Sequence, residues 1–311
     1  MAPIAIITVT YSPGQHLWDF VNSIPAATQR GGHVVIVDNG SRDGVPEAVC
    51  RADHPMPVEL IHSGGNVGYG AGMNIGWKAL RDKRQSGEID TDYLMIVNPD
   101  VVFNQGAIDR MIEAMERHPR AGAVGPLIRE IDGSVYPSAR AVPQLGSGIG
   151  HALLGPVWKN NPWTKRYLDD TDMSNERRAG WLSGSCLLLR WDAFESVNGF
   201  DERYFMYMED VDLGDRMGKA GWLNIFTPAA EIAHAQGHSA SKHPQITLKA
   251  HHDSAYRFQA DRLVGWKYAP VRAVLKAGLS TRCIIAVTLA QRALKKEQRQ
   301  KEQEEKKSHG V

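Results

Sequence analysis

The chain has 311 residues, of which 42% are hydrophobic and 23% are charged, and its formal net charge at pH 7 is +1. These values are typical of a globular chain that builds one large α/β domain with appendages, or two small domains. A net charge this close to zero gives no reason to expect nucleic-acid binding. Cys50, Cys186 and Cys283 lie far apart and lack metal or redox spacing, so we expect free thiols in a reducing compartment.

The apolar runs predict neither a signal peptide nor a transmembrane helix. The first run, Ile4–Val9, has no charged segment before it and is too short for a signal peptide. The longest late run, Cys283–Ala290, is interrupted by Thr288 and falls well short of the ~18 apolar residues that span a bilayer.

The first 120 residues alternate between two patterns. Apolar runs predict buried strands at residues 4–9, 34–37, 58–61 and 93–97. Segments with helical character follow them at about residues 17–24, 46–52, 72–84 and 105–117. This alternation predicts an α/β fold with a mostly parallel sheet and helices on both faces.

The second half follows a different pattern. Strands are predicted with little helix between them at residues 123–131, 133–136 and 184–190. Residues 143–178 form a long loop-rich connection, a type that is usually functional or mobile. Short helices are predicted at 191–197 and 209–220, and the chain has helical character from Gln245 to its end.

Polar residues follow three of the predicted strands. Asp100 comes directly after strand 93–97, and Pro99, which has no N–H to donate, suits the end of that strand. Asp38 ends the second strand and Tyr11 lies near the end of the first. Open α/β sheets bind ligands at this edge, where a carboxylate suits a metal that holds a phosphate-bearing ligand. The alternative for each Asp is a turn or a helix cap.

The glycine-rich stretch from Gly64 to Gly72 does not predict a dinucleotide cofactor. Its spacing differs from G-x-G-x-x-G, and it follows the third strand instead of the first. Close approach of its backbone to a diphosphate remains open.

Two further positions are candidates for chemistry. The apolar run Phe205–Met208 leads directly into Glu209 and Asp210, and partial burial raises the pKa of such carboxyls toward that of a general base. The alternative is a pair of acids that interact with the helix dipole. His234 follows an apolar pair, and a role for it depends on whether it lies near Asp100.

The C-terminal segment mixes basic and apolar residues. Between residues 266 and 292 they alternate at helical spacing, which is typical of a helix in a membrane interface. A helix packed on the domain or on a second subunit is the alternative. Residues 295–307 carry six Lys or Arg and four Glu, so we expect a solvated helical extension or disorder there.

Taken in order, several short motifs resemble the inverting family 2 glycosyltransferases of the GT-A fold, in their rhamnosyltransferase-like branch. Each motif is weak alone, but the ordered set is specific and spans residues 3–240. The motifs are Val9-Thr10-Tyr11, Val37-Asp38-Asn39-Gly40-Ser41, Asn66-Val67-Gly68-Tyr69-Gly70 with Asn74, Asn98-Pro99-Asp100, Gly184-Ser185-Cys186, Gly199-Phe200-Asp201, Met208 to Leu213, and His234 with Gly237 and Ser239.

The resemblance implies a Rossmann-like GT-A domain at residues 1–240, with a nucleotide-binding half (1–120) and an acceptor-binding half (121–240). C-terminal helices at 241–294 would then contact a membrane interface or form a dimer, and 295–311 would be a charged tail.

The resemblance also implies residue roles. Asp38 would accept the N3–H of the donor pyrimidine, and Thr10 and Tyr11 would line the base pocket. Asp100 and His234 would bind Mg²⁺ or Mn²⁺ on the donor diphosphate. Asp210, or its neighbour Glu209, would deprotonate the acceptor hydroxyl. Further substrate-binding positions would be Asn66, Gly68, Asn74, Asn98 and Gly184.

One departure from the family concerns the metal. Many relatives carry the motif Asp-x-Asp, and in this chain Asn98 takes the place of the first Asp. The protein therefore supplies the metal with one negative charge fewer.

For substrates, the branch implies dTDP-L-rhamnose as donor and a lipid-linked (decaprenyl-diphospho) N-acetylglucosamine as acceptor in cell-wall linker synthesis. The protein would then be cytoplasmic and peripheral to the inner face of the cell membrane. Alternatives are another donor, galactofuranose or a UDP-hexose, or a catalytically silent module that binds sugar nucleotide or lipid. Because thymine and uracil present the same N3–H, Asp38 leaves the nucleotide open.

Overall fold

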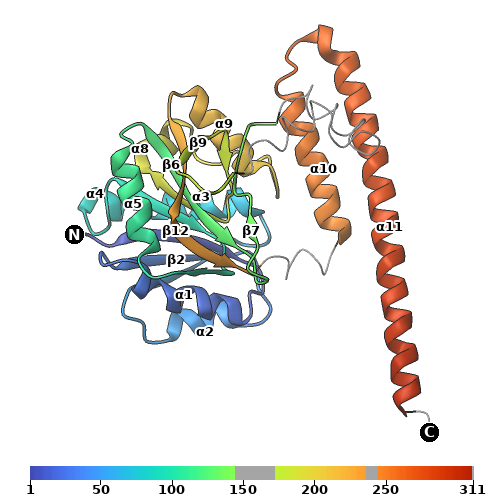
Figure 1. Ribbon diagram of the computed structural model, residues 1–311, viewed down its shortest axis with the longest axis horizontal. Coiled ribbons are helices and arrows are strands. Elements are labelled where there is room, and N and C mark those ends of the chain that lie inside the picture. Colours follow the sequence, from blue (N-terminus) through green and yellow to red (C-terminus); the bar gives the residue numbers. More distant parts are fainter. Residues whose placement is uncertain (144–171, 236–243, 310–311) are drawn as a thin grey trace. The chain divides into compact units, whose positions relative to one another are not determined.

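The computed structural model describes residues 1–143, 172–235 and 244–309, and the chain forms two compact units (Figure 1). The first unit comprises Met1–Phe205 and Glu209–Gln236, and the second comprises Met206–Met208 and Gly237–Val311. Most of the predicted connection at 143–178, and the motif residues Gly237 and Ser239, lie outside the described residues.

A mixed sheet forms the centre of the first unit, with strand order β3-β2-β1-β4-β11-β6-β12-β5. Its first four strands are parallel to one another, as the alternating pattern predicted: β1 (Ile4–Thr10), β2 (Gly32–Asp38), β3 (Val58–His62) and β4 (Tyr93–Val97). Parallel strands are buried on both faces and therefore show nearly continuous apolar runs. Every residue of β1, β2 and β4 is buried accordingly.

The other half of the sheet contains both strand directions. β11 runs antiparallel to β4 and to β6, whereas β12 runs parallel to β6 and antiparallel to β5. These strands are β5 (Val101–Phe103), β6 (Ala121–Arg129), β11 (Cys186–Arg190) and β12 (Leu223–His234). Shorter strands pair at its margins: β7 (Val135–Tyr136) with β6 and β9 (Arg177–Ala179) with β12. A separate two-stranded sheet consists of β8 (Ala139–Arg140) and β10 (Trp181–Leu182).

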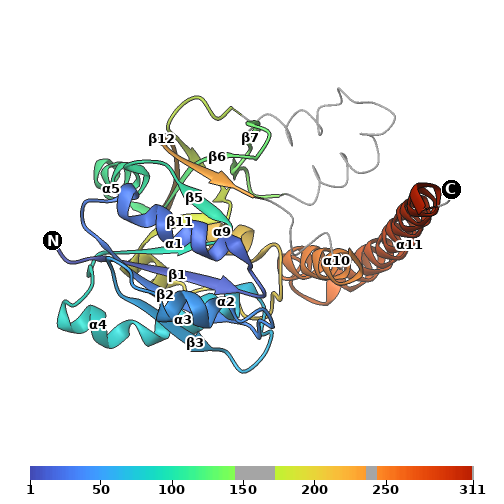
Figure 2. The same cartoon turned by 90° about the horizontal axis from the view of Figure 1, so that it is seen from below.

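Helices cover both faces of the sheet (Figure 2). The buried apolar side chains of the sheet divide between two separate cores. Ile4 and Ile6 of β1 belong to one core, whereas Ala5 and Ile7 belong to the other. The first core is closed by α1 (Gln15–Ala27), α2 (Val45–Arg51) and α5 (Ala107–Arg117). The second is closed by α3 (Tyr69–Ala79), α8 (Trp191–Ser196) and α9 (Glu209–Lys219). The helix predicted at 72–84 is divided into α3 and α4 (Arg81–Ser86).

The second unit is helical, as the sequence predicted from Gln245 onward. It contains α10 (Pro244–Ala260), the short 3₁₀ helix η1 (Trp266–Tyr268) and α11 (Ala269–His309). The expectation that no segment is long and apolar enough to span a membrane is wrong. By length and composition, the helical segment Trp266–Arg292 meets this criterion. The expectation considered only uninterrupted apolar runs, whereas a helix tolerates an occasional charge within a long apolar segment.

Candidate active site

The carboxyl ends of the parallel strands bring the first group of polar residues together. Thr10 and Asp38 are cross-strand partners at the ends of β1 and β2. The Thr10 hydroxyl donates a hydrogen bond to Asp38 Oδ1 over 3.2 Å. Asp38 is only 3% exposed, whereas the Tyr11 side chain beyond β1 is exposed. A buried acid thus lies beside an exposed aromatic ring at one edge of the sheet.

Asp38 also stabilises the turn that follows β2. Its carboxylate accepts the Ser41 N–H at 3.0 and 3.1 Å and the Gly40 N–H at 3.3 Å. The turn predicted as the alternative to a binding role is therefore present. Together with the Thr10 hydroxyl, these donors make four contacts with the two carboxylate oxygens, and His62 Nδ1 lies 3.6 Å from Oδ2. The acceptor positions of the carboxylate, about four in number, are therefore largely taken by protein groups.

A possible cation group lies beside this turn. Asp38, Glu47 and His62 each offer one ligand atom, and these three atoms lie within 4.8 Å of one another, which a metal ion accepts. Among the described residues, no other group of three His, Cys, Asp or Glu side chains is arranged in this way. The sequence had placed the metal at Asp100 instead.

Glycines at the start of α3 and within it make close packing contacts. Gly68 has φ +93°, and a Cβ there would lie 2.4 Å from the Phe205 carbonyl oxygen. A Cβ on Gly72 would lie 2.8 Å from Val9, and one on Gly76 would lie 2.6 Å from Ile7. These glycines let α3 lie close to β1 and to the loop before α9. Asn66 accepts the Gly68 N–H at 3.2 Å and so holds the loop.

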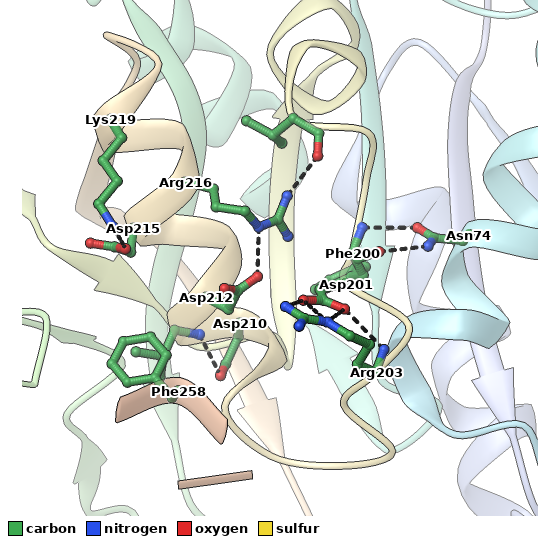
Figure 3. A network of polar contacts seen from close by, with 12 residues as sticks. Asn74, Phe200, Asp201, Arg203, Asp210, Asp212, Asp215, Arg216, Lys219 and Phe258 are labelled. Carbon is green, nitrogen blue, oxygen red and sulfur yellow. Dashed lines mark hydrogen bonds and ion pairs between the residues drawn. The ribbon is translucent and has the colours of Figure 1, made fainter. Parts of the chain in front are cut away.

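Asn74 clamps the backbone of the same loop (Figure 3). Its amide nitrogen donates to the Phe200 carbonyl at 2.9 Å, and its oxygen accepts the Phe200 N–H at 2.9 Å. The amide nitrogen also donates to Glu202 at 3.0 Å. Since Asn74 is 1% exposed and its amide is engaged by protein groups, the structure gives it a structural role in place of the substrate contact that was predicted.

Asp100 and His234 meet in space, which the sequence alone left open. β12 ends at His234, whose cross-strand partner is Val101, so the imidazole lies next to the acid just before that residue. His234 Nε2 lies 3.0 Å from Asp100 Oδ1 and 3.3 Å from the Asn98 side-chain nitrogen.

These contacts fit a divalent cation. His234 Nε2 can donate to Asp100 when it carries a proton, or accept from the Asn98 side-chain nitrogen when it does not, but it cannot do both. Both contacts are satisfied only if the Asn98 amide is flipped or a cation is bound. A carboxylate oxygen and an imidazole nitrogen are both ligands for Mn²⁺. Asp100 and His234 would therefore hold such an ion from one side and leave positions for phosphate oxygens.

Glu209 and Asp210 begin α9, and the structure treats them differently. Asp210 accepts the Gly184 N–H at 3.0 Å and the Val211 N–H at 2.8 Å. Glu209 is buried, and its Oε2 has no hydrogen-bond partner among the described residues. Burial, followed by the charge of Asp210, raises the pKa of Glu209 to about 8. Burial also raises the pKa of Asp210, and its two backbone donors oppose that rise.

The surroundings of the two acids therefore differ. A carboxylate that accepts two N–H groups is stabilised in its charged form, whereas a buried oxygen without a donor is not. Burial thus favours the protonated form of Glu209, whereas the two backbone donors favour the charged form of Asp210. The later acids of α9, Asp212 and Asp215, pair with Arg216 and Lys219 one turn further on (Figure 3).

Sequence reasoning assigned no role to Tyr69, although it lies within a recognised motif. Its hydroxyl donates to the Gly184 carbonyl oxygen over 2.5 Å, and Gly184 in turn donates its N–H to Asp210. Burial, then the charges of Glu209 and Asp210, raises the pKa of Tyr69 well above its usual value. The Tyr69 phenol therefore stays protonated, and its hydrogen bond holds in place Gly184, whose N–H contacts Asp210.

Comparisons with known proteins identify the family of this chain. The Glycosyl transferase family 2 model matches residues 5–188. The chain is 50% identical over 287 residues to the N-acetylglucosaminyl-diphospho-decaprenol L-rhamnosyltransferase of Mycobacterium tuberculosis, covering 91% of this chain and 92% of that protein. It is 27% identical to the rhamnosyltransferase WbbL of Escherichia coli K12, covering 84% of this chain and 94% of that protein.

Solved structures show the same fold at low sequence identity. GalNAc-T7 with UDP, GalNAc and Mn²⁺ aligns with a TM-score of 0.55 and 14% identity, covering 90% of this chain and 55% of that chain. The mannosyltransferase PcManGT of Pyrobaculum calidifontis with GDP-Man and Mn²⁺ aligns with a TM-score of 0.51 and 18% identity, covering 94% of this chain and 74% of that chain. With the family model spanning more than half of its length, this chain belongs to glycosyltransferase family 2 and has the GT-A type of fold.

Proposed function

We propose that this protein is an inverting L-rhamnosyltransferase that uses dTDP-L-rhamnose and glycosylates decaprenyl-diphospho-N-acetylglucosamine. The observation that carries the proposal is the 50% identity to the mycobacterial enzyme over 92% of that enzyme's length. Such an enzyme needs a site that binds the leaving diphosphate, a base for the acceptor hydroxyl and access to lipid. We assign each of these needs to residues of the chain.

The donor would lie along the carboxyl edge of the parallel strands. Asp38 would accept the N3–H of the base beside Thr10 and Tyr11, with Asn66 and Gly68 in the neighbouring loop. Asp100 and His234 would hold Mg²⁺ or Mn²⁺, which neutralises the charge that develops on the leaving diphosphate. Asn98, as a neutral residue, would add no charge to this site.

Asp210 would act as the general base. Inversion by direct displacement requires one group that removes the proton of the acceptor hydroxyl. Asp210 suits this role because its two backbone donors orient it and favour its charged form, whereas burial favours the protonated form of Glu209.

A lipid-linked acceptor would bring the enzyme to a membrane, and the second unit has exposed apolar side chains that would contact it. Trp266 of η1 and Val274 and Ile284 of α11 are 88%, 74% and 68% exposed. Although the segment is long enough to span a bilayer, Lys276 and Arg282 interrupt its apolar surface, and charges at the bilayer centre are costly. A position in the interface of the inner leaflet satisfies both classes of side chain.

The function is tested by product formation. Purified protein, Mg²⁺ or Mn²⁺, and a short-chain diphospholipid acceptor that carries N-acetylglucosamine are mixed with dTDP-L-rhamnose, UDP-galactofuranose or a UDP-hexose in parallel. We expect a rhamnosylated lipid and free dTDP in the first reaction only, and loss of both in EDTA. Turnover of a UDP sugar alone would reassign the donor, and no turnover with any donor would favour a binding module.

A further inference from the structure

Arg140 lies on a small two-stranded ribbon beside the proposed base. In this ribbon β8 pairs with β10, and Trp181 is the cross-strand partner of Arg140. Further backbone bonds extend the ribbon: the Gly180 N–H donates to the Arg140 carbonyl at 2.9 Å, and the Ser183 N–H donates to the Ser138 carbonyl at 2.7 Å. The position of Arg140 is therefore set by paired backbone.

The Arg140 guanidinium is held by aromatic rings, and no acid pairs with it among the described residues. Its Cζ lies 5.6 Å from the centroid of the Tyr136 ring and 5.9 Å from that of Trp181. Its Nε donates to the Pro137 carbonyl at 2.9 Å. An Arg side chain has five N–H donors, so most of its donor capacity remains after this single bond.

The ribbon leads from Arg140 toward Asp210 in two ways, through packing on α9 and through Gly184. Trp181 packs on α9, because a Cβ on Gly214, one turn after Asp210, would lie 2.7 Å from the Trp181 Cβ. β10 then leads within two residues to Gly184, which donates its N–H to Asp210. Burial raises the pKa of Tyr136, and the charges of Arg140 and Asp210 act on it in opposite directions. The charge of Arg140 also acts on Asp210 itself, where it opposes the rise in pKa that burial causes.

We propose that Arg140 binds the diphosphate of the lipid-linked acceptor, an inference that rests on the proposed function. When the acceptor hydroxyl lies against Asp210, the diphosphate on the same sugar lies about one ring away and needs a cation of its own. The metal at Asp100 and His234 is committed to the donor diphosphate. A guanidinium that aromatic rings hold in place presents a planar pair of donors to phosphate oxygens at little entropic cost.

The test compares acceptors that differ only in charge. Two soluble acceptors with the same alkyl chain are used, one that links N-acetylglucosamine through a diphosphate and one through an uncharged ether. Wild-type protein, Arg140→Gln and Arg140→Lys are assayed for kcat and KM with each. Arg190→Gln is the matched control, because Arg190 also lies over a tyrosine ring, with its Cζ 5.4 Å from the centroid of Tyr93, and donates through Nε to a backbone carbonyl, that of Ala121, at 3.1 Å.

We expect Arg140→Gln to raise the KM for the diphosphate acceptor roughly 10- to 100-fold, the loss typical of a hydrogen bond between charged groups. The preference of the enzyme for the charged acceptor should fall by the same factor, while the KM for the donor stays at the wild-type value. Arg140→Lys should retain part of the preference, and Arg190→Gln all of it.

Two results would overturn the assignment. One is an equal rise in KM for both acceptors, which would indicate a structural role in the ribbon. The other is a rise confined to the donor, which would move the contact to the nucleotide diphosphate. Because wild-type transfer is measured in the same experiment, failure of the proposed rhamnosyl transfer itself appears separately, as no product with either acceptor.

Discussion

At the scale of single residues, the pair Glu209 and Asp210 has the clearest division of labour. Glu209 is buried and Asp210 is half-buried, and Asp210 accepts the N–H groups of Gly184 and Val211. Glu209 Oε2 has no hydrogen-bond partner among the described residues. Tyr69 supports this arrangement through its bond to the Gly184 carbonyl. The proposed base is thus positioned by backbone groups, and its role should respond sharply to a change in charge.

The first prediction concerns turnover. Asp210→Asn keeps the shape of the side chain and removes its basicity, so kcat should fall by roughly 10²- to 10⁴-fold with donor affinity nearly unchanged. Glu209→Gln should reduce kcat much less, because a neutral amide resembles the protonated acid. Steady-state kinetics and donor titration check this, and the reverse order of the two variants would make Glu209 the base.

The second prediction concerns stability and pH. Because the pKa of Glu209 is raised to about 8, the folded chain binds its proton between pH ~4.5 and ~8 whereas the unfolded chain does not. The contribution of Glu209 to the free energy of unfolding is therefore greatest at low pH and declines as pH rises through that interval. The melting temperature of Glu209→Gln relative to wild type should increase between pH 5 and pH 8.5. A difference that stays constant with pH would show that Glu209 ionises normally.

Residue-level reasoning from the sequence identified acids more reliably than their supports. Asp100 and His234 were chosen from strand ends and a motif, and they do lie in contact. Tyr69 and Arg140 were missed, because a phenol that supports a loop and a guanidinium held by aromatic rings have no spacing signature. Their positions depend on strand pairing between distant segments.

At the scale of elements, glycine explains how α3 fits against its neighbours. The third prediction is that Gly68→Ala destabilises the fold by about 1–3 kcal/mol more than Gly64→Ala, because only Gly68 combines a positive φ with a clash against backbone. Gly64 has φ +85° and open space around its Cβ position, which makes it a matched control. Denaturant unfolding measures the difference. A loss of donor affinity at unchanged stability would instead favour a diphosphate contact.

The strands that were predicted from the sequence are marked by runs of apolar residues, and the strands that were missed have no such run. β1, β2 and β4 are uninterrupted apolar runs, which parallel strands require. β12 escaped prediction because Pro228, Ala229 and Glu231 interrupt it, and the register shift between Thr227 and Glu231 accommodates that interruption. β8, β9 and β10 have two or three residues each, too few for any pattern to develop.

At the scale of the whole molecule, the proposed function divides chemistry and lipid contact between the two units. The first contains the strand ends and acids described above, and the second presents exposed apolar side chains on α11. An α11 that binds a membrane interface, as proposed, would raise the local concentration of a membrane-bound acceptor without adding a contact to the proposed active site.

The fourth prediction tests this division. Replacing Ile284 and Ile285, which are 68% and 55% exposed, by Glu should weaken binding to anionic liposomes while activity on a short soluble acceptor persists. Ile131→Glu, at a position that is 83% exposed in the first unit, is the control and should leave partitioning unchanged. Liposome co-sedimentation provides the measurement. Altered oligomeric state with unaltered partitioning would assign the helix to a subunit contact.

The contact between Asp100 and His234 joins residues that are 134 positions apart in the chain, and this separation has a consequence for biosynthesis. Loop closure over such a distance is slow compared with local pairing, and β12 reaches its place only after the ribosome has made nearly the whole first unit. β1 to β4 precede it by more than a hundred residues, so a nascent chain has the proposed nucleotide-binding edge before it has the complete proposed cation site. A ribosome-stalled or proteolysed fragment would then lack His234, and on the proposed mechanism incomplete copies of the enzyme would not consume sugar nucleotide.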